Sequence, residues 1–188
     1  MKAEARWLMR VVPWLLLGGI GIWGFAGGWK GLERQLFERK AQGMFANVGG
    51  VTEARVYLLR GSKARRTGEV FPIRPYGTDA PVHGSVTLKG KELAAFLDLW
   101  RGQSVSIDDQ ALCHDPVYGF RLYRGGKLMG ETSVCWHCSN FYVDVSPSES
   151  VWCGFDADSE AAKGLLGYCD RLLPYDRGRE VSSEGKGE

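Results

Sequence analysis

The stretch CHDPVYGFRLYRGGKLMGETSVCWHC, residues 113–138, predicts a β-hairpin that carries cysteines at its open end. Gly125 and Gly126 separate two runs of strand-like composition, and a Gly-Gly pair is favoured in two-residue hairpin turns because both positions need positive φ. With that turn, Cys113 lies opposite Cys138. Pro116 then lies opposite Cys135.

The predicted hairpin brings three thiols and two imidazoles together, and zinc is one group that they suit. Side chains alternate between the faces of a strand, so Cys135 and Cys138 share a side only if the chain bends between them. Such a bend is typical of zinc knuckles. Cys113 with His114 or His137 would complete a tetrahedral ligand set.

A disulfide between Cys113 and Cys138 is an alternative to zinc. Opposed residues in a non-hydrogen-bonded antiparallel pair approach to about 4.5 Å between Cα atoms, which is compatible with a bridge. An exported domain would preserve this bond. The chain has five cysteines, so at least one thiol stays free or pairs between chains. We expect Cys153 and Cys169 to be buried small apolar residues, or a second bridge.

A third interpretation is a thiol-disulfide oxidoreductase, with Cys135 as nucleophile and Cys138 as resolving thiol. That chemistry usually places the first sulfur at a helix N-terminus, where the helix dipole lowers the pKa of the thiol. Here predicted strands flank the motif. The sequence therefore favours a protein that is not an enzyme.

Residues 113–123 followed by 134–141 resemble a pattern in uncharacterised bacterial proteins that are often exported or lipid-anchored. That pattern combines Cys-(aromatic or His)-x-Pro, a strand ending in Tyr, and Ile/Val-Cys-x-x-Cys, and it covers about 30 residues. The resemblance implies kinship without naming an activity. It directs attention to Cys113, Pro116, Cys135 and Cys138.

The N-terminus predicts a membrane anchor. Val11–Trp29 contains no charged residue and is long enough, as a helix, to cross a hydrocarbon core of about 30 Å. Trp7 and Trp29 lie where interfacial aromatic residues are usual. Gly24-Phe25-Ala26 leaves a cleaved signal peptide as the alternative. Basic residues before the segment predict a single-pass inner-membrane protein with a periplasmic domain.

Composition limits the partners. The formal net charge of +2 is too small to indicate nucleic acid. The basic cluster of Arg60, Lys63, Arg65 and Arg66 reads as a solvated loop because no aromatic residues are interleaved for base stacking. The expected partner is the membrane; a protein partner is unknown. The function expected is a binding or interaction module, stabilised by zinc or a disulfide.

The rest of the chain predicts an α+β domain. Its antiparallel sheet has about five or six strands, with two helices on one face and Arg121 and Tyr123 on the exposed face. The organisation expected is an anchor at 1–30, a neck at 31–50, the domain at 51–175 and a disordered tail at 176–188. Within the domain we expect strands at 52–59 and 85–88, a loop at 60–82, helices at 91–101 and 159–173, and a second hairpin from 140–145 and 150–155.

Overall fold

The computed structural model describes residues 31–32, 34–43, 45–61, 66–74, 76–106, 113–146 and 149–175. The predicted anchor and the predicted tail lie outside these ranges. Within them, none of the helices has the length and apolar character needed to span a membrane. The chain divides into two compact units, Met1–Lys40 and Ala41–Glu188. The described residues of the first unit are helical, and Leu32 and Leu36 are exposed there.

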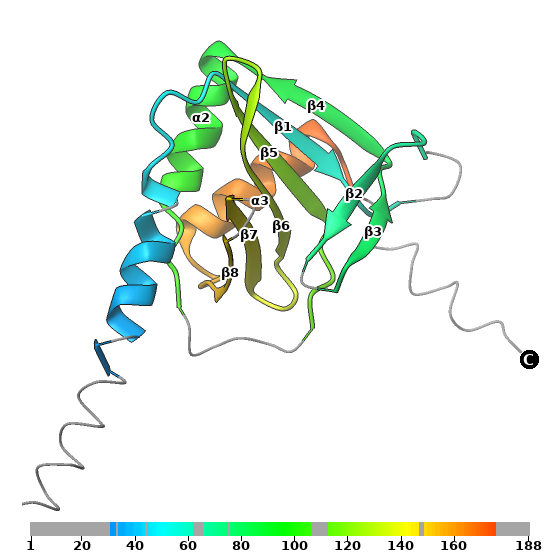
Figure 1. Cartoon of the computed structure of the whole chain (residues 1–188). Helices are drawn as coiled ribbons and strands as arrows, with labels where there is room; N and C mark the ends of the chain where they lie inside the picture. The colour runs from blue at the N-terminus through cyan, green and yellow to red at the C-terminus, as the bar shows by residue number, and fades with distance from the viewer. Residues whose placement is uncertain are drawn as a thin grey trace, which may run out of the picture. The chain divides into compact units, whose positions relative to one another are not determined.

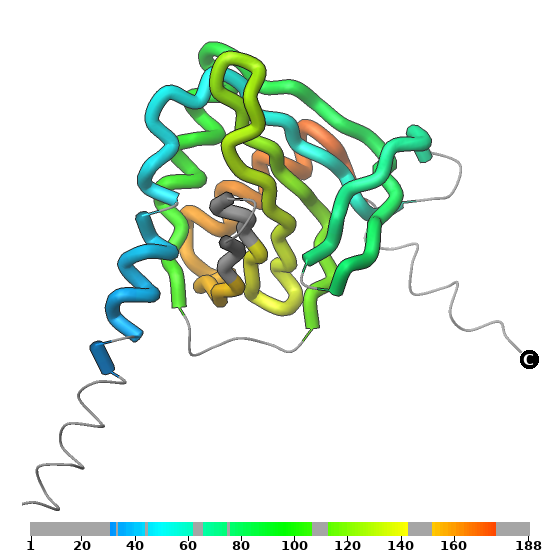
Figure 2. Tube along the Cα trace, viewed as in Figure 1, coloured from blue at the N-terminus to red at the C-terminus, as the bar shows by residue number. Residues whose placement is uncertain are grey.

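Six antiparallel strands form the main sheet of the second unit, in the order β4-β1-β5-β6-β7-β8. The last four strands are a meander in which each pairs with the next, as the chain path in Figure 2 shows. The predicted α+β class and antiparallel sheet are confirmed. The strands are β1 (Glu53–Leu58), β4 (Gly84–Leu88), β5 (Tyr118–Arg124), β6 (Lys127–Cys135), β7 (Asn140–Ser146) and β8 (Glu149–Gly154).

Two helices, α2 (Gly90–Arg101) and α3 (Glu160–Leu172), cover one face of this sheet (Figure 1). Apolar residues recur at helical spacing in α2, and Leu93, Phe96, Leu97 and Trp100 are buried as that spacing predicts. Helix α3 begins where the Ser159 hydroxyl accepts a hydrogen bond from the Ala162 N–H, which satisfies a helix-end donor. We call the covered face the helix face and the other the outer face.

The main core lies between the helix face and the two helices. Phe120 and Phe141 contribute from the strands and Trp100 from α2, with ring centroids 5.7 and 5.8 Å from that of Trp100. Phe45 also packs on Trp100, at 4.8 Å. The expected neck at 31–50 therefore gives residues to the core: Ala41, Phe45 and Val48 are all buried.

The prediction of a loop at 60–82 is wrong. Strands β2 (Val70–Ile73) and β3 (Thr78–Pro81) form a separate two-stranded sheet, and Phe71 packs on the outer face at Gly119. The prolines and glycines of this stretch obscured the strand pattern. Proline is tolerated in a two-stranded sheet because each strand has an unpaired edge.

This hairpin also changes the surroundings of Arg121, which we expected on an exposed face. The Arg121 guanidinium donates to Glu131 at 2.6 Å and to the Tyr57 hydroxyl at 3.2 Å. It lies 5.0 Å from the ring centroids of both Tyr57 and Phe71. Arg121 and Tyr123 are thus half-buried, because the hairpin shields part of the outer face.

The predicted turn at Gly125 and Gly126 is confirmed, with φ of 55° and 83°. The predicted register holds only next to it, where Arg124 pairs with Lys127. A bulge between Leu122 and Tyr123 then shifts the pairing by one residue. Strand β5 begins at Tyr118 and Cys135 pairs with Asn140 of β7, so the predicted pairing of Pro116 with Cys135 is wrong.

Candidate functional site at the disulfide end of the sheet

A disulfide joins Cys113 to Cys138, with Cα atoms 6.0 Å apart. Cys113 stands in the loop before β5, and Cys138 stands in the four-residue turn between β6 and β7. That turn supplies the bend that the Cys-x-x-Cys spacing requires. Ser139 closes it with φ of 51°, a conformation that no other described non-glycine residue adopts. The bond fastens the loop before β5 to the end of the sheet.

Cys135 is free and buried beside this disulfide. Its Sγ accepts a hydrogen bond from the Cys138 N–H at 3.1 Å. The backbone N–H groups of Asp115 and His137 also face this sulfur. Burial raises the pKa of the Cys135 thiol, and the three backbone N–H groups act in the opposite direction. Cys135 is therefore a protonated thiol at neutral pH, with donors already placed for its thiolate.

His114 is held by a buried hydrogen-bond network on the outer face. Its Nδ1 lies 2.6 Å from Asn140 Oδ1 and its Nε2 lies 2.7 Å from Ser133 Oγ. The Asn140 amide nitrogen donates to the Cys113 carbonyl at 2.7 Å. Because Asn140 Oδ1 can only accept, the network assigns the proton of neutral His114 to Nδ1. Burial lowers the pKa of His114, which favours this neutral form.

The five residues suggested as metal ligands do not form one site in this structure. Cys113 and Cys138 bond to each other, both ring nitrogens of His114 have protein partners, and the His137 side chain is exposed. In the described part of the chain, no three His, Cys, Asp or Glu residues are arranged to hold a metal ion. Zinc binding stays a prediction, and it concerns a chain whose disulfide is reduced.

The other two cysteines belong to the core. Cys153 and Cys169 are both free and buried. Burial raises the pKa of Cys153 to about 12 and raises that of Cys169 further. The suggested bridge between them is absent, and both act as small apolar residues at neutral pH.

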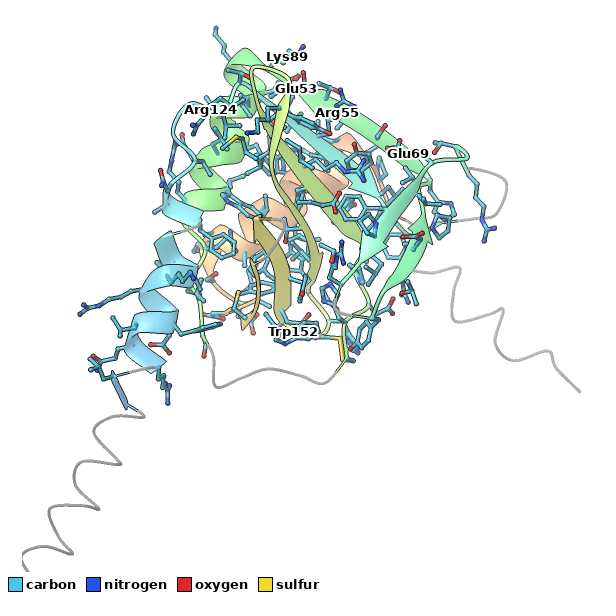
Figure 3. The ribbon with its side chains drawn as sticks, in the orientation of Figure 1. Glu53, Arg55, Glu69, Lys89, Arg124 and Trp152 are labelled. Atoms are coloured by element: carbon cyan, nitrogen blue, oxygen red, sulfur yellow. A yellow bond between two sulfur atoms is a disulfide. The ribbon has the colours of Figure 1, made fainter. Side chains whose placement is uncertain are left out.

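An aromatic cluster that we did not predict lies next to His114. It consists of Tyr76, Tyr142 and Trp152. Trp152 contacts the ring of Tyr142 at 5.9 Å and that of Tyr76 at 6.3 Å, and it meets His114 at 5.2 Å. Figure 3 shows Trp152 at the same end of the sheet as the disulfide.

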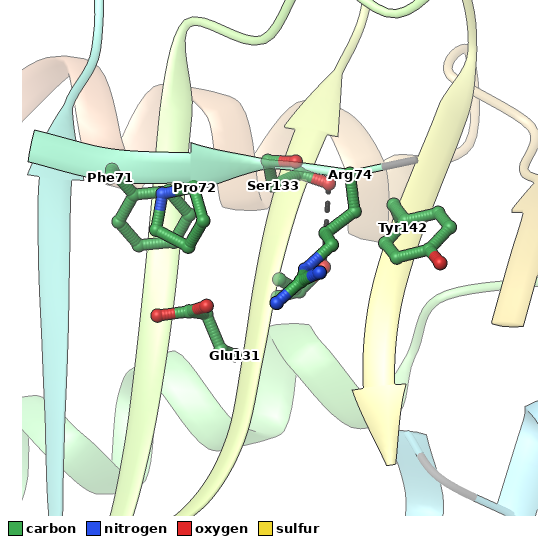
Figure 4. A pocket seen from close by; sticks show the side chains of 7 residues that line it. Phe71, Pro72, Arg74, Glu131, Ser133 and Tyr142 are labelled. Atoms are coloured by element: carbon green, nitrogen blue, oxygen red, sulfur yellow. Dashed lines mark hydrogen bonds between the residues drawn. The ribbon is translucent and has the colours of Figure 1, made fainter. Parts of the chain in front are cut away.

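A shallow depression adjoins the aromatic cluster on the outer face, between β2 and the main sheet. Figure 4 shows Arg74, Glu131 and Tyr142 around it, so that a cation, an anion and an aromatic ring border one surface. The depression is too shallow to enclose a small molecule, and suits a surface contact better. The lining residues are Phe71, Pro72, Arg74, Glu131, Thr132, Ser133 and Tyr142.

The residues that the sequence analysis missed carried only weak signals. Tyr142 lies opposite Trp152 in the β7–β8 pairing, on the face away from the buried Phe141 and Cys153. The strand alternation places these two rings together once the pairing is known. For Asn140, the one signal was a polar residue at the start of an apolar alternation. Its partner His114 could not be identified without the register.

Comparisons of the chain with protein-family models, with curated proteins and with solved structures gave no match.

Proposed function

We propose that this chain is a membrane-anchored binding module whose ligand contacts the outer face, at the aromatic cluster and the adjoining depression. The observation that carries the proposal is the fastened loop: the Cys113–Cys138 bond holds His114 against Trp152. Loss of side-chain and loop freedom opposes binding, so a surface ordered in advance binds more tightly. The disulfide is here a structural element of the binding surface.

The anchor and the periplasmic location belong to the same proposal. Residues 1–30 would form a single-pass inner-membrane helix, and the domain would face an oxidising compartment. A disulfide agrees with this location because such bonds persist outside the reducing cytoplasm. Fusions of alkaline phosphatase and of green fluorescent protein to the C-terminus test the orientation. Phosphatase activity without fluorescence is expected, and the reverse result would overturn the exported location.

Site-specific photo-crosslinking in living cells tests the binding face. A photoreactive phenylalanine analogue replaces Tyr76, whose side chain is half exposed. The matched control carries the analogue at Asp98 of α2, which is exposed on another element. Adducts at position 76 that are absent at position 98 are expected. Equal adduct patterns at both positions would contradict a binding role for the outer face.

A thiol-disulfide oxidoreductase that uses Cys135 and Cys138 is the alternative function. The flanking elements argue against it, because the motif lies between β6 and β7 and Cys138 is bonded to Cys113. Insulin reduction in the presence of a dithiol separates the two functions. We expect no acceleration over the uncatalysed rate, whereas turnover would favour the enzyme.

A further inference from the structure

We propose that Cys135 is the attacking thiol of an internal disulfide exchange. Its sulfur attacks Sγ of Cys138, the disulfide moves to the Cys135–Cys138 pair, and Cys113 leaves as a free thiol. The inference goes beyond the proposed binding function and does not depend on it.

The first argument is the position of the Cys135 sulfur. Its contact with the Cys138 N–H places it against one half of the disulfide. The Asp115 N–H that faces it stands two residues after Cys113, the other half. Cys135 is only 1% exposed, so reagents in solution have little access to it. The neighbouring disulfide is the electrophile nearest to this thiol along both chain segments.

The second argument concerns which sulfur leaves. Thiol-disulfide exchange is faster when the departing thiolate is better stabilised. Cys138 is buried, whereas Cys113 is exposed at the end of the loop. Water can therefore solvate the departing sulfur of Cys113. The backbone N–H groups around Cys135 stabilise the thiolate that attacks.

The exchange balances without any added reagent. The Cys113–Cys138 bond breaks as a Cys135–Cys138 bond forms, and the proton that leaves Cys135 ends on Cys113 through solvent. The number of disulfides and the number of thiols do not change. No oxidant or reductant is consumed.

The product differs from the starting state at the outer face. Cys113 becomes an exposed thiol, which is a nucleophile for disulfides in solution. The loop before β5 is then held only by noncovalent contacts, which include the hydrogen bonds from His114 and from Asn140. The exchange thus turns a fastened loop into a released loop with a reactive end.

Alkylation of the full-length chain tests the exchange. The protein is purified in mild detergent without reductant and incubated with iodoacetamide, which traps free thiols irreversibly, and its disulfides are mapped by peptide mass spectrometry. Alkylated Cys113 together with a Cys135–Cys138 bond is expected to accumulate. Below the pKa of the attacking thiol, its rate should rise about tenfold per pH unit because the thiolate fraction does so.

The Cys135→Ser variant provides the decisive comparison. It should lose Cys113 alkylation and retain the Cys113–Cys138 bond, whereas Cys153→Ser, which removes another buried thiol, should behave as the unaltered chain does. Alkylation of Cys113 at equal rates with and without Cys135 would overturn the proposal, as would its absence from the unaltered chain. If circular dichroism shows that the serine variant does not fold, Cys135→Ala takes its place.

Discussion

The two faces of the main sheet are covered by different means. On the helix face, α2 and α3 bury a continuous set of aromatic and aliphatic side chains, with Phe120 and Trp100 near its centre. On the outer face, the β2–β3 hairpin covers a second, smaller cluster that includes Tyr57 and Phe71. The loop before β5 covers a further part through a disulfide and the His114 network.

The difference shows how stability and a binding surface can be separated within one sheet. The helix face is closed by apolar burial, which is nondirectional and dominates the free energy of folding. The outer face is closed by one close packing contact, one covalent bond and one set of hydrogen bonds. Substitutions on the helix face should therefore unfold the domain, whereas those on the outer face should act on individual covers.

The largest effect is expected from Phe120→Ala. The side chain is fully buried between Phe96 and Trp100, and its loss should lower the free energy of unfolding by about 3–5 kcal/mol. Urea denaturation followed by tryptophan fluorescence measures it. Leu128→Ala, at an exposed position, is the control and should change stability by no more than about 0.5 kcal/mol. Similar losses in both variants would contradict the assigned core.

The next effect is expected from Cys113→Ser, which removes the disulfide on the outer face. The bond links residues separated by 25 positions, and its loss should cost about 2–4 kcal/mol, chiefly because the unfolded chain gains freedom. Thermal unfolding with and without a dithiol measures it. Reductant should destabilise the unaltered chain and leave the variant unchanged; a reductant effect of equal size in both would show that another bond is involved.

Gly119→Ala should have a smaller effect on the hairpin cover. A Cβ at this position would lie 2.7 Å from the Phe71 ring, and overpacking of this kind costs about 1–3 kcal/mol. Limited proteolysis of the β2–β3 hairpin and urea denaturation report it. Adding Phe71→Leu should recover part of the loss because the shortened side chain gives room. Gly49→Ala, where a Cβ meets no atom within 4 Å, is the control.

The smallest effect is expected from pH at His114. Burial lowers its pKa in the folded state, so above the unfolded value of about 6.5 both states are neutral. As the pH falls below that value, the unfolded chain gains a proton before the folded chain does, and stability declines. His114→Gln removes this contribution. The stability gap between the unaltered chain and the variant should shrink from pH 8 to pH 5.5, and a constant gap would exclude the effect.

Regular patterns in the sequence predicted much of the helix face. Spacing of Leu93, Phe96 and Trp100 identified α2, and Ser159 with the stripe that follows identified α3. The Gly125-Gly126 turn identified the β5–β6 hairpin. The outer face was less accessible, because proline and glycine obscured β2 and β3. The bulge beside Tyr123 also altered the register that the turn had set.

The sequence by itself determined the periodic elements, the central turn and the presence of cysteines at one end of the sheet. These features depend on local φ preferences and on the spacing of apolar residues, which act over a few positions. Only the tertiary structure decided that His114 bonds to Asn140 and Ser133, that Trp152 meets Tyr76, and that Cys135 stays free beside the disulfide. The physical reason is that these contacts join distant segments, and a shift of one residue in strand pairing changes which side chains meet.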